Sequence, residues 1–342
     1  MSDIRALSNA LQSLWSHCRA GASPQGRKEQ LQQLVSPDTV WHLSAPIETC
    51  IGPEGIESDL VTPLMNSLDH LHRRPELFVA GHSALPGQEG DWAAGYGHLV
   101  GNFNSPLLGL QPNGHLVFLR YGEFYRLESG RVTEARIILD WVDFMRQIGA
   151  PCLPHDLGTE IQFPAPASGD GVRLAPEDPR ESARTLQLVE DMLGDLRSFD
   201  PETFESAGQS GSGGYWHEDM LWYGPGGIGS NLSYDGFQKD HRIPFLSGFP
   251  DRVGGNHFAR FGAGPYAASG GWPSITATHG GDYLGIPATQ KAITMRVMDF
   301  WRAQDGQLIE NWVFIDLVDL CAQLGVDLLA RGQAAQRHHA AS

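Results

Sequence analysis

The sequence predicts an α+β fold built as two tandem, cone-shaped domains. Three observations predict it: the chain is long enough for two domains, its second half repeats the pattern of its first, and each half combines an amphipathic helix with long strands. Of the 342 residues, 41% are hydrophobic and 19% are charged, so each half can bury a core. A helix packed on a curved antiparallel sheet forms a cone with a pocket on its concave face.

The repeat is clearest between residues 109–149 and 285–325, which align without a gap at an offset of 176. The identical pairs include Gly109 and Gly285, Arg120 and Arg296, Phe124 and Phe300, Arg126 and Arg302, Gly130 and Gly306, Glu134 and Glu310, Asp140 and Asp316, Asp143 and Asp319, Gln147 and Gln323, and Gly149 and Gly325. Upstream, an offset of 181 aligns Trp41 with Trp222. Because the repeated unit exceeds 100 residues, it indicates a duplicated domain rather than a solenoid.

Each half shows the same order of elements. An amphipathic helix comes first, then a short strand with a tryptophan, a helical or irregular stretch, long strands joined by a Gly-containing hairpin turn, and a short closing helix. The expected ranges are helices near 6–19 and 181–199, short strands at 40–43 and 220–223, and hairpins of 115–127 with 131–139 and of 291–302 with 307–315.

Composition also sets the domain limits. The first domain is expected over residues 1–152 and the second over 181–330. The segment 153–180 holds many Pro and Gly residues with little periodicity, which is typical of a linker, and 331–342 is expected to be a frayed tail.

The balance of charge argues against several classes of partner. There are 24 Lys and Arg against 40 Asp and Glu, a formal charge of −16, which disfavours a nucleic acid or an anionic membrane. No apolar stretch is long enough to span a bilayer, and the first residues do not resemble a signal peptide, so a cytoplasmic location is expected. The widely separated Cys18, Cys50, Cys152 and Cys321 predict free thiols.

The end of the last predicted strand carries a candidate catalytic carboxylate. Alternation along 309–316 places Glu310, Trp312, Phe314 and Asp316 on one face. An aspartate beside aromatic walls is desolvated, which raises its pKa toward the range useful for proton transfer. The alternative is structural, because an aspartate here also caps the closing helix. Both interpretations apply equally to Asp140 in the first half.

Other polar residues of the second half have two interpretations each. His279 lies among glycines and either shuttles protons or bonds to its loop, and Asp282 either orients that histidine or belongs to a turn. Arg296 and Arg302 share one face of their strand, whereas Asp299 and its neighbour Trp301 point the other way. Only one set can face the cavity. Arginines there suit a carboxylate or enolate, and otherwise they pair with acids on an outer face.

Aromatic and imidazole rings also gather in this half. They form either pocket walls for a flat ligand or ordinary core packing. The candidates are Trp222, Tyr223, His241, His257 and Trp272. No metal site is expected among the histidines of the second half, since no HExxH or HxH spacing occurs there, and no GxSxG elbow indicates a hydrolase.

Residues 276–325 carry a recognisable set of motifs. They are Thr278-His279, Gly281, Tyr283, Gly285, Pro287, Thr289, Asp305-Gly306, Glu310, Trp312, Asp316 and Gln323-Leu324-Gly325. Together they resemble the SnoaL-like polyketide cyclase (ester cyclase) family of the nuclear transport factor 2-like superfamily. The first half is similar but more degenerate.

The resemblance implies a fold, a site and a chemistry. Two tandem nuclear transport factor 2-like cones are expected, paired within the chain because single-domain relatives pair through their sheets, with a homodimer of the chain as a further expectation. The family's catalytic aspartate falls on Asp316, and by the repeat on Asp140, acting without metal or cofactor. A histidine of some members falls on Arg302.

We therefore expect cofactor-independent acid/base catalysis on a small hydrophobic carbonyl compound, as aldol cyclisation, isomerisation or dehydration, in the pocket of the second domain. The alternative is a binding or carrier protein without catalysis. The expected catalytic residues are Asp316, His279 and Asp140. The expected substrate-binding residues are Trp222, Tyr223, His241, His257, Trp272, Asp282, Arg296, Arg302 and Trp312.

Overall fold

The computed structural model describes residues 4–15, 24–154, 156–158, 161–200, 202–206, 208–209 and 213–340. Cys18 and the end of the helix predicted at 6–19 lie outside these ranges. Cys50, Cys152 and Cys321 are buried free thiols, each with a pKa raised by burial to about 12. No helix within the described ranges has the length and apolar character needed to cross a membrane.

Each half contains one curved sheet, and the strand order is the same in both halves. The first sheet runs β2-β1-β6-β5-β4-β3, and the second runs β8-β7-β13-β12-β11-β10 with β9 beside β11. The first strands are β1 (Val35–Leu43), β2 (Thr49–Ile51), β3 (Leu68–Ser83), β4 (Gly90–Phe103), β5 (Leu116–Glu128) and β6 (Arg131–Leu139). The second set is β7 (Trp216–Tyr223), β8 (Ser230–Leu232), β9 (Val253–Gly254), β10 (His257–Ala263), β11 (Tyr266–Thr278), β12 (Ala292–Gln304) and β13 (Gln307–Ile315).

The predicted α+β class with two tandem cones is confirmed, with one correction to the sheets. They are mixed rather than purely antiparallel, because β1 pairs in parallel with β6, and β7 pairs in parallel with β13. Most of each domain, including its other strands, lies between the two paired strands in the sequence, so the connection is long enough for a parallel pairing.

The helices also repeat. The stretch between the short strands and the long ones is helical in both halves, and its middle turn is π-helical at Glu57–Val61 and Gln238–Arg242. The helices are α1 (Ile4–Leu14), α2 (Pro24–Leu34), α3 (Gly52–Ile56), α4 (Thr62–Ser67), α5 (Trp141–Gln147), α6 (Pro179–Arg197), α7 (Ser233–Phe237), α8 (Ile243–Gly248), α9 (Leu317–Leu324) and α10 (Leu328–Ala340). Helix α6 begins where Asp178 caps it and Pro179 fixes the first turn.

The C-terminal segment differs from its prediction. Residues 331–340 belong to α10 and are not frayed, although residues 341–342 lie outside the description. The Gln333 side chain donates to the Leu108 carbonyl at 3.0 Å, and the Gln336 amide exchanges hydrogen bonds with the Gln111 backbone at 2.9 and 3.0 Å. The end of the chain is therefore attached to a loop of the first half.

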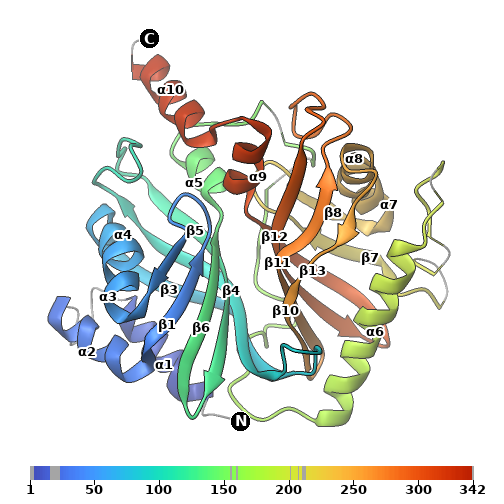
Figure 1. Cartoon of the computed structure of the whole chain (residues 1–342), viewed down its shortest axis with the longest axis horizontal. Helices are drawn as coiled ribbons and strands as arrows, with labels where there is room; N and C mark the ends of the chain where they lie inside the picture. The colour runs from blue at the N-terminus through green and yellow to red at the C-terminus, as the bar shows by residue number, and fades with distance from the viewer. Residues whose placement is uncertain are drawn as a thin grey trace.

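The two sheets meet in the middle of the molecule, with α1–α4 on the outer side of the first sheet and α6–α8 on the outer side of the second (Figure 1). Helices α5 and α9 lie together at one end of this junction. We call the side chains between the sheets the intersheet cluster. Its aromatic contacts include Trp92 with Phe258 at 5.4 Å, Tyr96 with Trp312 at 5.2 Å, and Phe124 with Phe300 at 5.6 Å between ring centroids. The sheets are therefore buried on both faces.

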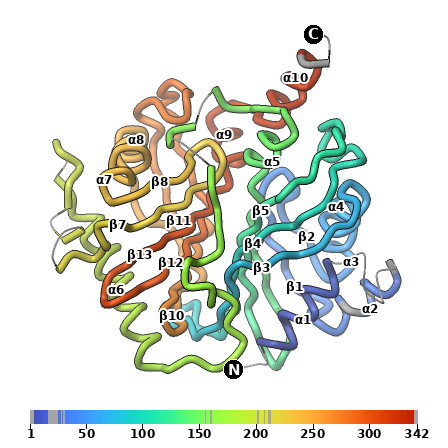
Figure 2. Tube along the Cα trace, turned by 180° about the vertical axis from the view of Figure 1, so that it is seen from behind, coloured from blue at the N-terminus to red at the C-terminus, as the bar shows by residue number. Residues whose placement is uncertain are grey.

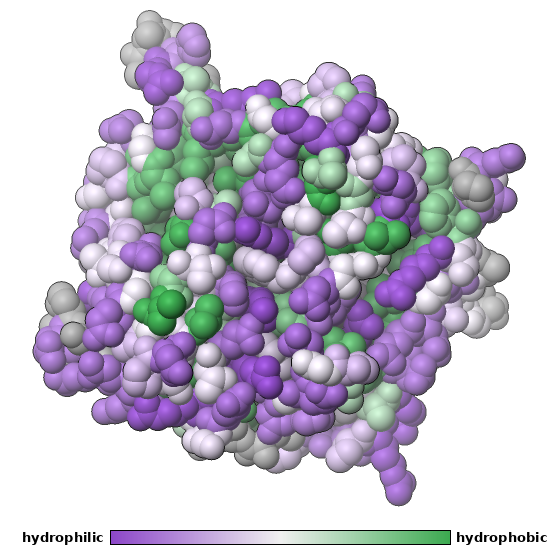
Figure 3. All heavy atoms as spheres, viewed as in Figure 1, coloured by the Kyte–Doolittle hydropathy of each residue, from purple (hydrophilic) through white to green (hydrophobic). Residues whose placement is uncertain are grey.

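The linker joins this packing, as its path in Figure 2 shows. The Pro164 carbonyl accepts from the Tyr96 hydroxyl of the first half and from the Trp312 indole of the second. On the face drawn in Figure 3, hydrophobic residues form separate patches among hydrophilic ones. This surface does not test the expected homodimer of the chain, which stays a prediction.

Candidate functional site

A cavity of about 320 Å³ lies in the second half, between the concave face of its sheet and helices α6, α7 and α8. Its walls are largely apolar, including Trp216, Trp222 and Phe245. Alternation along the strands selects which side chains enter. On β12 the odd-numbered residues face the cavity, among them Met295, Val297, Asp299 and Trp301, and on β13 they are Asn311, Val313 and Ile315.

Asp299 is the only carboxylate among the described residues that line this cavity. Its side chain is half-buried, because it lies in the sheet and borders the cavity. Burial raises its pKa to about 7, opposed by a hydrogen bond from Asn311 and by the charge of Arg260. A carboxyl group with this pKa can both take up and return a proton near neutral pH.

The polar groups near Asp299 are held by hydrogen bonds, and none of them is a carboxylate. The Arg260 Nε donates to the Ser269 hydroxyl at 3.2 Å, and the Asn311 amide donates to the Phe300 carbonyl at 3.0 Å. His257 lies 3.3 Å from the Ser274 hydroxyl, and burial lowers its pKa to about 4. The imidazole is therefore neutral at pH 7.

His241 forms part of an aromatic wall. Its ring stacks on Trp222 at 4.0 Å and faces Phe245 at 5.7 Å. Burial lowers its pKa to about 3, and its Nδ1 has no hydrogen-bond partner among the described residues. The His241 imidazole is therefore neutral at pH 7, and its Nδ1 is the polar atom without a partner in the described residues.

The three predicted substrate-binding residues that line the cavity are Trp222, His241 and His257. Six others do not appear in its walls: Tyr223, Trp272, Asp282, Arg296, Arg302 and Trp312. The three predicted catalytic residues, Asp316, His279 and Asp140, are also absent from them.

Asp316 lies at the boundary between the two halves. It caps α9 by accepting from the Asp319 backbone N–H, it accepts from the Ala45 N–H at 2.9 Å, and it pairs with Arg296 at 3.0 Å. Burial raises its pKa to about 6. All of these contacts are with protein groups, so the side chain joins the halves instead of facing the cavity.

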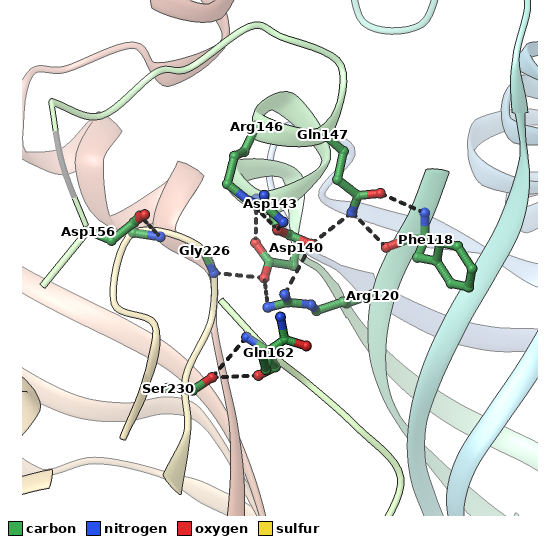
Figure 4. Close-up of polar contacts among 11 residues, drawn as sticks. Phe118, Arg120, Asp140, Asp143, Arg146, Gln147, Asp156, Gln162, Gly226 and Ser230 are labelled. Carbon is green, nitrogen blue, oxygen red and sulfur yellow. Dashed lines mark hydrogen bonds and ion pairs between the residues drawn. The ribbon is translucent and has the colours of Figure 1, made fainter. Parts of the chain in front are cut away.

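Asp140 repeats this arrangement in reverse (Figure 4). It accepts from the Asp143 N–H, from the Gly226 N–H at 2.9 Å, and from Arg120 at 3.2 Å. Residues 45 and 226 correspond at the offset of 181. We call these two reciprocal contacts the aspartate clasps. Arg120 and Arg296 are repeated because each completes a clasp.

The remaining predicted residues have structural partners too. Arg302 pairs with Glu310 at 2.5 Å, and that carboxylate accepts from the Ala167 N–H of the linker. Trp312 and Tyr223 stack at 5.5 Å within the intersheet cluster. The face of Glu310 and Trp312 therefore points toward the first half and the linker.

His279 and its neighbours organise a loop. Its Nδ1 accepts from the Thr289 N–H at 3.2 Å, its ring is wholly buried beside Phe249, and burial lowers its pKa. Asp282 accepts from the Ala288 N–H at 3.2 Å. Trp272 lies at the boundary, 6.1 Å from His42 and under the Arg296 guanidinium.

The first half has a different interior at the equivalent position. Glu123 of β5 corresponds to Asp299 of β12. Glu123 lies opposite Gly95 of β4, and Asp299 lies opposite Ser269, the equivalent position of β11. Glu123 is buried in an ion pair with Arg73 and accepts from the Tyr125 hydroxyl at 2.8 Å. Phe78 stands where the second half has Arg260. This carboxylate is held by protein partners.

Sequence reasoning missed Asp299 as a catalytic candidate. The alternating apolar residues Ile293, Met295 and Val297 share its face, which is a signal for the cavity side. However, Met298 and Phe300 on the other face are equally buried, because the first half covers them. No group of three or more His, Cys, Asp or Glu side chains suited to a metal occurs in the part of the chain that is described.

Comparison with known sequences now identifies the family. The profile of the SnoaL-like polyketide cyclase family matches residues 11–148 and again residues 212–324. The chain belongs to the SnoaL-like polyketide cyclase family. This SnoaL-like chain holds two copies of the domain, as its internal repeat indicates. No curated protein matches it significantly.

Several solved structures resemble one domain of this SnoaL-like protein. A SnoaL-like polyketide cyclase from Jannaschia sp. CCS1, described as putative, is 19% identical with a TM-score of 0.33, over 44% of this chain and 92% of its own. IdmH of Streptomyces antibioticus, also described as a putative polyketide cyclase, is 21% identical with a TM-score of 0.29, over 42% and 98%. AclR of Streptomyces galilaeus, described as a putative hydroxylase, is 21% identical with a TM-score of 0.33, over 42% and 86%.

Proposed function

We propose that the second domain catalyses proton transfer at a carbon next to a carbonyl group, with Asp299 as the general acid/base. The reaction class is the polyketide-cyclase-like one: aldol cyclisation, isomerisation or dehydration of a small hydrophobic carbonyl compound. The observation that carries the proposal is the position of Asp299, a carboxylate with a pKa near 7 inside an apolar cavity. Family membership supports the same class of reaction.

The chemistry follows from the surroundings of that carboxylate. An ionised Asp299 removes a proton from the carbon acid, and the developing enolate oxygen needs a hydrogen-bond donor. Arg260 supplies N–H groups on the same wall. The protonated Asp299 then returns the proton, either to carbon in an isomerisation or to an oxygen that leaves in a dehydration.

The first domain is assigned a supporting role in this proposal. Its corresponding carboxylate, Glu123, is occupied by Arg73 and Tyr125 and has no cation in the place of Arg260. Its aspartate clasp holds the loop that follows β7, a cavity strand. One working cavity per chain is therefore expected.

The test uses 2-tetralone, a flat ketone with exchangeable protons next to its carbonyl, in D2O. Proton NMR follows deuterium incorporation. The wild-type protein is expected to accelerate exchange over buffer, and Asp299→Asn is expected to lose roughly 100-fold or more of that acceleration. Asp305→Asn, an exposed turn residue of the same hairpin, is the matched control.

Two results would contradict the proposal. Full exchange by Asp299→Asn would remove that residue from the chemistry. Loss of exchange in a normally folded Asp316→Asn variant would return the catalytic role to the aspartate clasp. Tight binding of 2-tetralone without any exchange would instead favour a binding or carrier protein.

A further inference from the structure

Arg252 is an arginine of the cavity wall with no counter-ion in the described part of the chain. It follows α8, is partly buried, and its guanidinium lies 4.8 Å from the Phe199 ring and 5.7 Å from the Phe245 ring. Among the described residues, no carboxylate pairs with it and no acceptor takes a hydrogen bond from its guanidinium. Its N–H donors at the cavity wall therefore have no protein acceptor in this part of the chain.

A second arginine makes this charge more costly. Arg242 is 4% exposed and donates to the Tyr234 hydroxyl at 2.6 Å, the Ser206 hydroxyl at 2.6 Å, and the Gln238 amide. All three acceptors are neutral. Burial and repulsion from Arg242 together lower the pKa of Arg252 to about 10, so its guanidinium remains charged at pH 7. An anion at Arg252 would relieve this repulsion.

The cavity as a whole is positive in a negative molecule. Arg197, Arg242, Arg252 and Arg260 line it against the single carboxylate of Asp299, whereas the chain carries a formal charge of −16. A cleft of one sign with apolar walls focuses its field on ligands of the opposite sign.

We propose that the substrate is a carboxylate, an aromatic or otherwise flat carbonyl compound whose carboxylate group binds Arg252 while its reacting carbon lies at Asp299. This rests on the proposed function and names its substrate class. The rings of Phe199 and Phe245 hold the guanidinium in place, and Trp222 and His241 belong to the wall that would enclose the flat part of the ligand.

The test compares two unreactive probes, 2-naphthoate and methyl 2-naphthoate, by isothermal titration calorimetry at pH 7. They share the ring and differ in charge. We expect 2-naphthoate to bind roughly tenfold or more tightly than the ester, and Arg252→Gln to remove that preference without weakening the ester. Arg252→Lys should retain part of it. Arg184→Gln, which removes an exposed charge from α6, is the control.

Equal binding of the two probes, or failure of both to bind, would overturn the proposal. So would an equal loss of both in Arg252→Gln, or a loss of naphthoate affinity in Arg184→Gln as large as in Arg252→Gln. The outcome is separable from the proposed function. A naphthoate preference that depends on Arg252, in a protein without deuterium exchange, would leave the carboxylate site standing and remove only the catalysis.

Discussion

Asp299 and Asp316 show how one residue type serves two purposes in the same domain. Burial raises both pKa values, to about 7 and about 6. The oxygens of Asp316 are taken by two backbone N–H groups and Arg296, so they have no room for a ligand. Asp299 borders a cavity, and its proton can reach a bound molecule. The raised pKa alone does not distinguish them, but the neighbours do.

The raised pKa of Asp299 predicts a pH-dependent stability. The folded state holds its proton up to about pH 7, whereas the unfolded chain releases it near pH 4. The wild-type protein should therefore lose stability relative to Asp299→Asn as the pH rises from 4 to 7, by on the order of 2–4 kcal/mol. Urea unfolding at several pH values measures this, and parallel curves for the two proteins would contradict it.

Activity should follow the same titration in the opposite direction. Proton abstraction needs the ionised carboxylate, so the exchange rate under kcat/KM conditions should rise with pH and level off above about pH 7. Deuterium exchange of 2-tetralone across pH 5–9 checks this. A profile that stays flat through this range would mean that another group carries the proton.

At the scale of elements, the aspartate clasps connect each closing helix to the opposite half. Asp140→Asn and Asp316→Asn keep the helix cap but remove the ion pair. We expect a loss of about 3 kcal/mol for Asp140→Asn, because Arg120 is buried but keeps its ion pair with Asp143 at 3.2 Å. The loss for Asp316→Asn should be smaller, about 2 kcal/mol. The side chain of Arg120 is 4% exposed and that of Arg296 is 18% exposed, so the second pair is better solvated.

Chemical unfolding of the two variants, with Asp305→Asn as the reference, measures which of them loses more free energy of unfolding. A larger loss in Asp316→Asn than in Asp140→Asn would show that burial does not rank the clasps. An unchanged stability in both would mean that the clasps do not join the halves.

At the scale of the molecule, we expect the intersheet cluster to make the two domains unfold as one unit. Tyr96 contacts Trp312 and Phe300 across the boundary, and all three are fully buried. Tyr96→Ala should cost about 3–5 kcal/mol and lower the protection of amide hydrogens in both sheets. Hydrogen exchange read by mass spectrometry reports each half separately. Phe118→Ala, at a 38% exposed aromatic, is the control, and loss confined to the first half would contradict a shared unit.

The sequence by itself determined the duplication, the α+β class, most strands and the family. These depend on local periodicity and on residues repeated at a fixed offset, both of which can be read along the chain. It also located three cavity residues, Trp222, His241 and His257. The motif that marks the family, however, drew attention to Asp316, whose conspicuous position reflects a helix cap and a contact between halves.

Only the tertiary structure decided which carboxylate enters the cavity. An amphipathic strand in an ordinary sheet shows one apolar face, and that face identifies the core. Here the second copy of the domain covers the outer face of β12, so Phe300 is as buried as Trp301 and the two faces are equivalent in sequence. The packing of one sheet on the other shows that Asp299 lies on the cavity face of β12 and Arg296 on the opposite face.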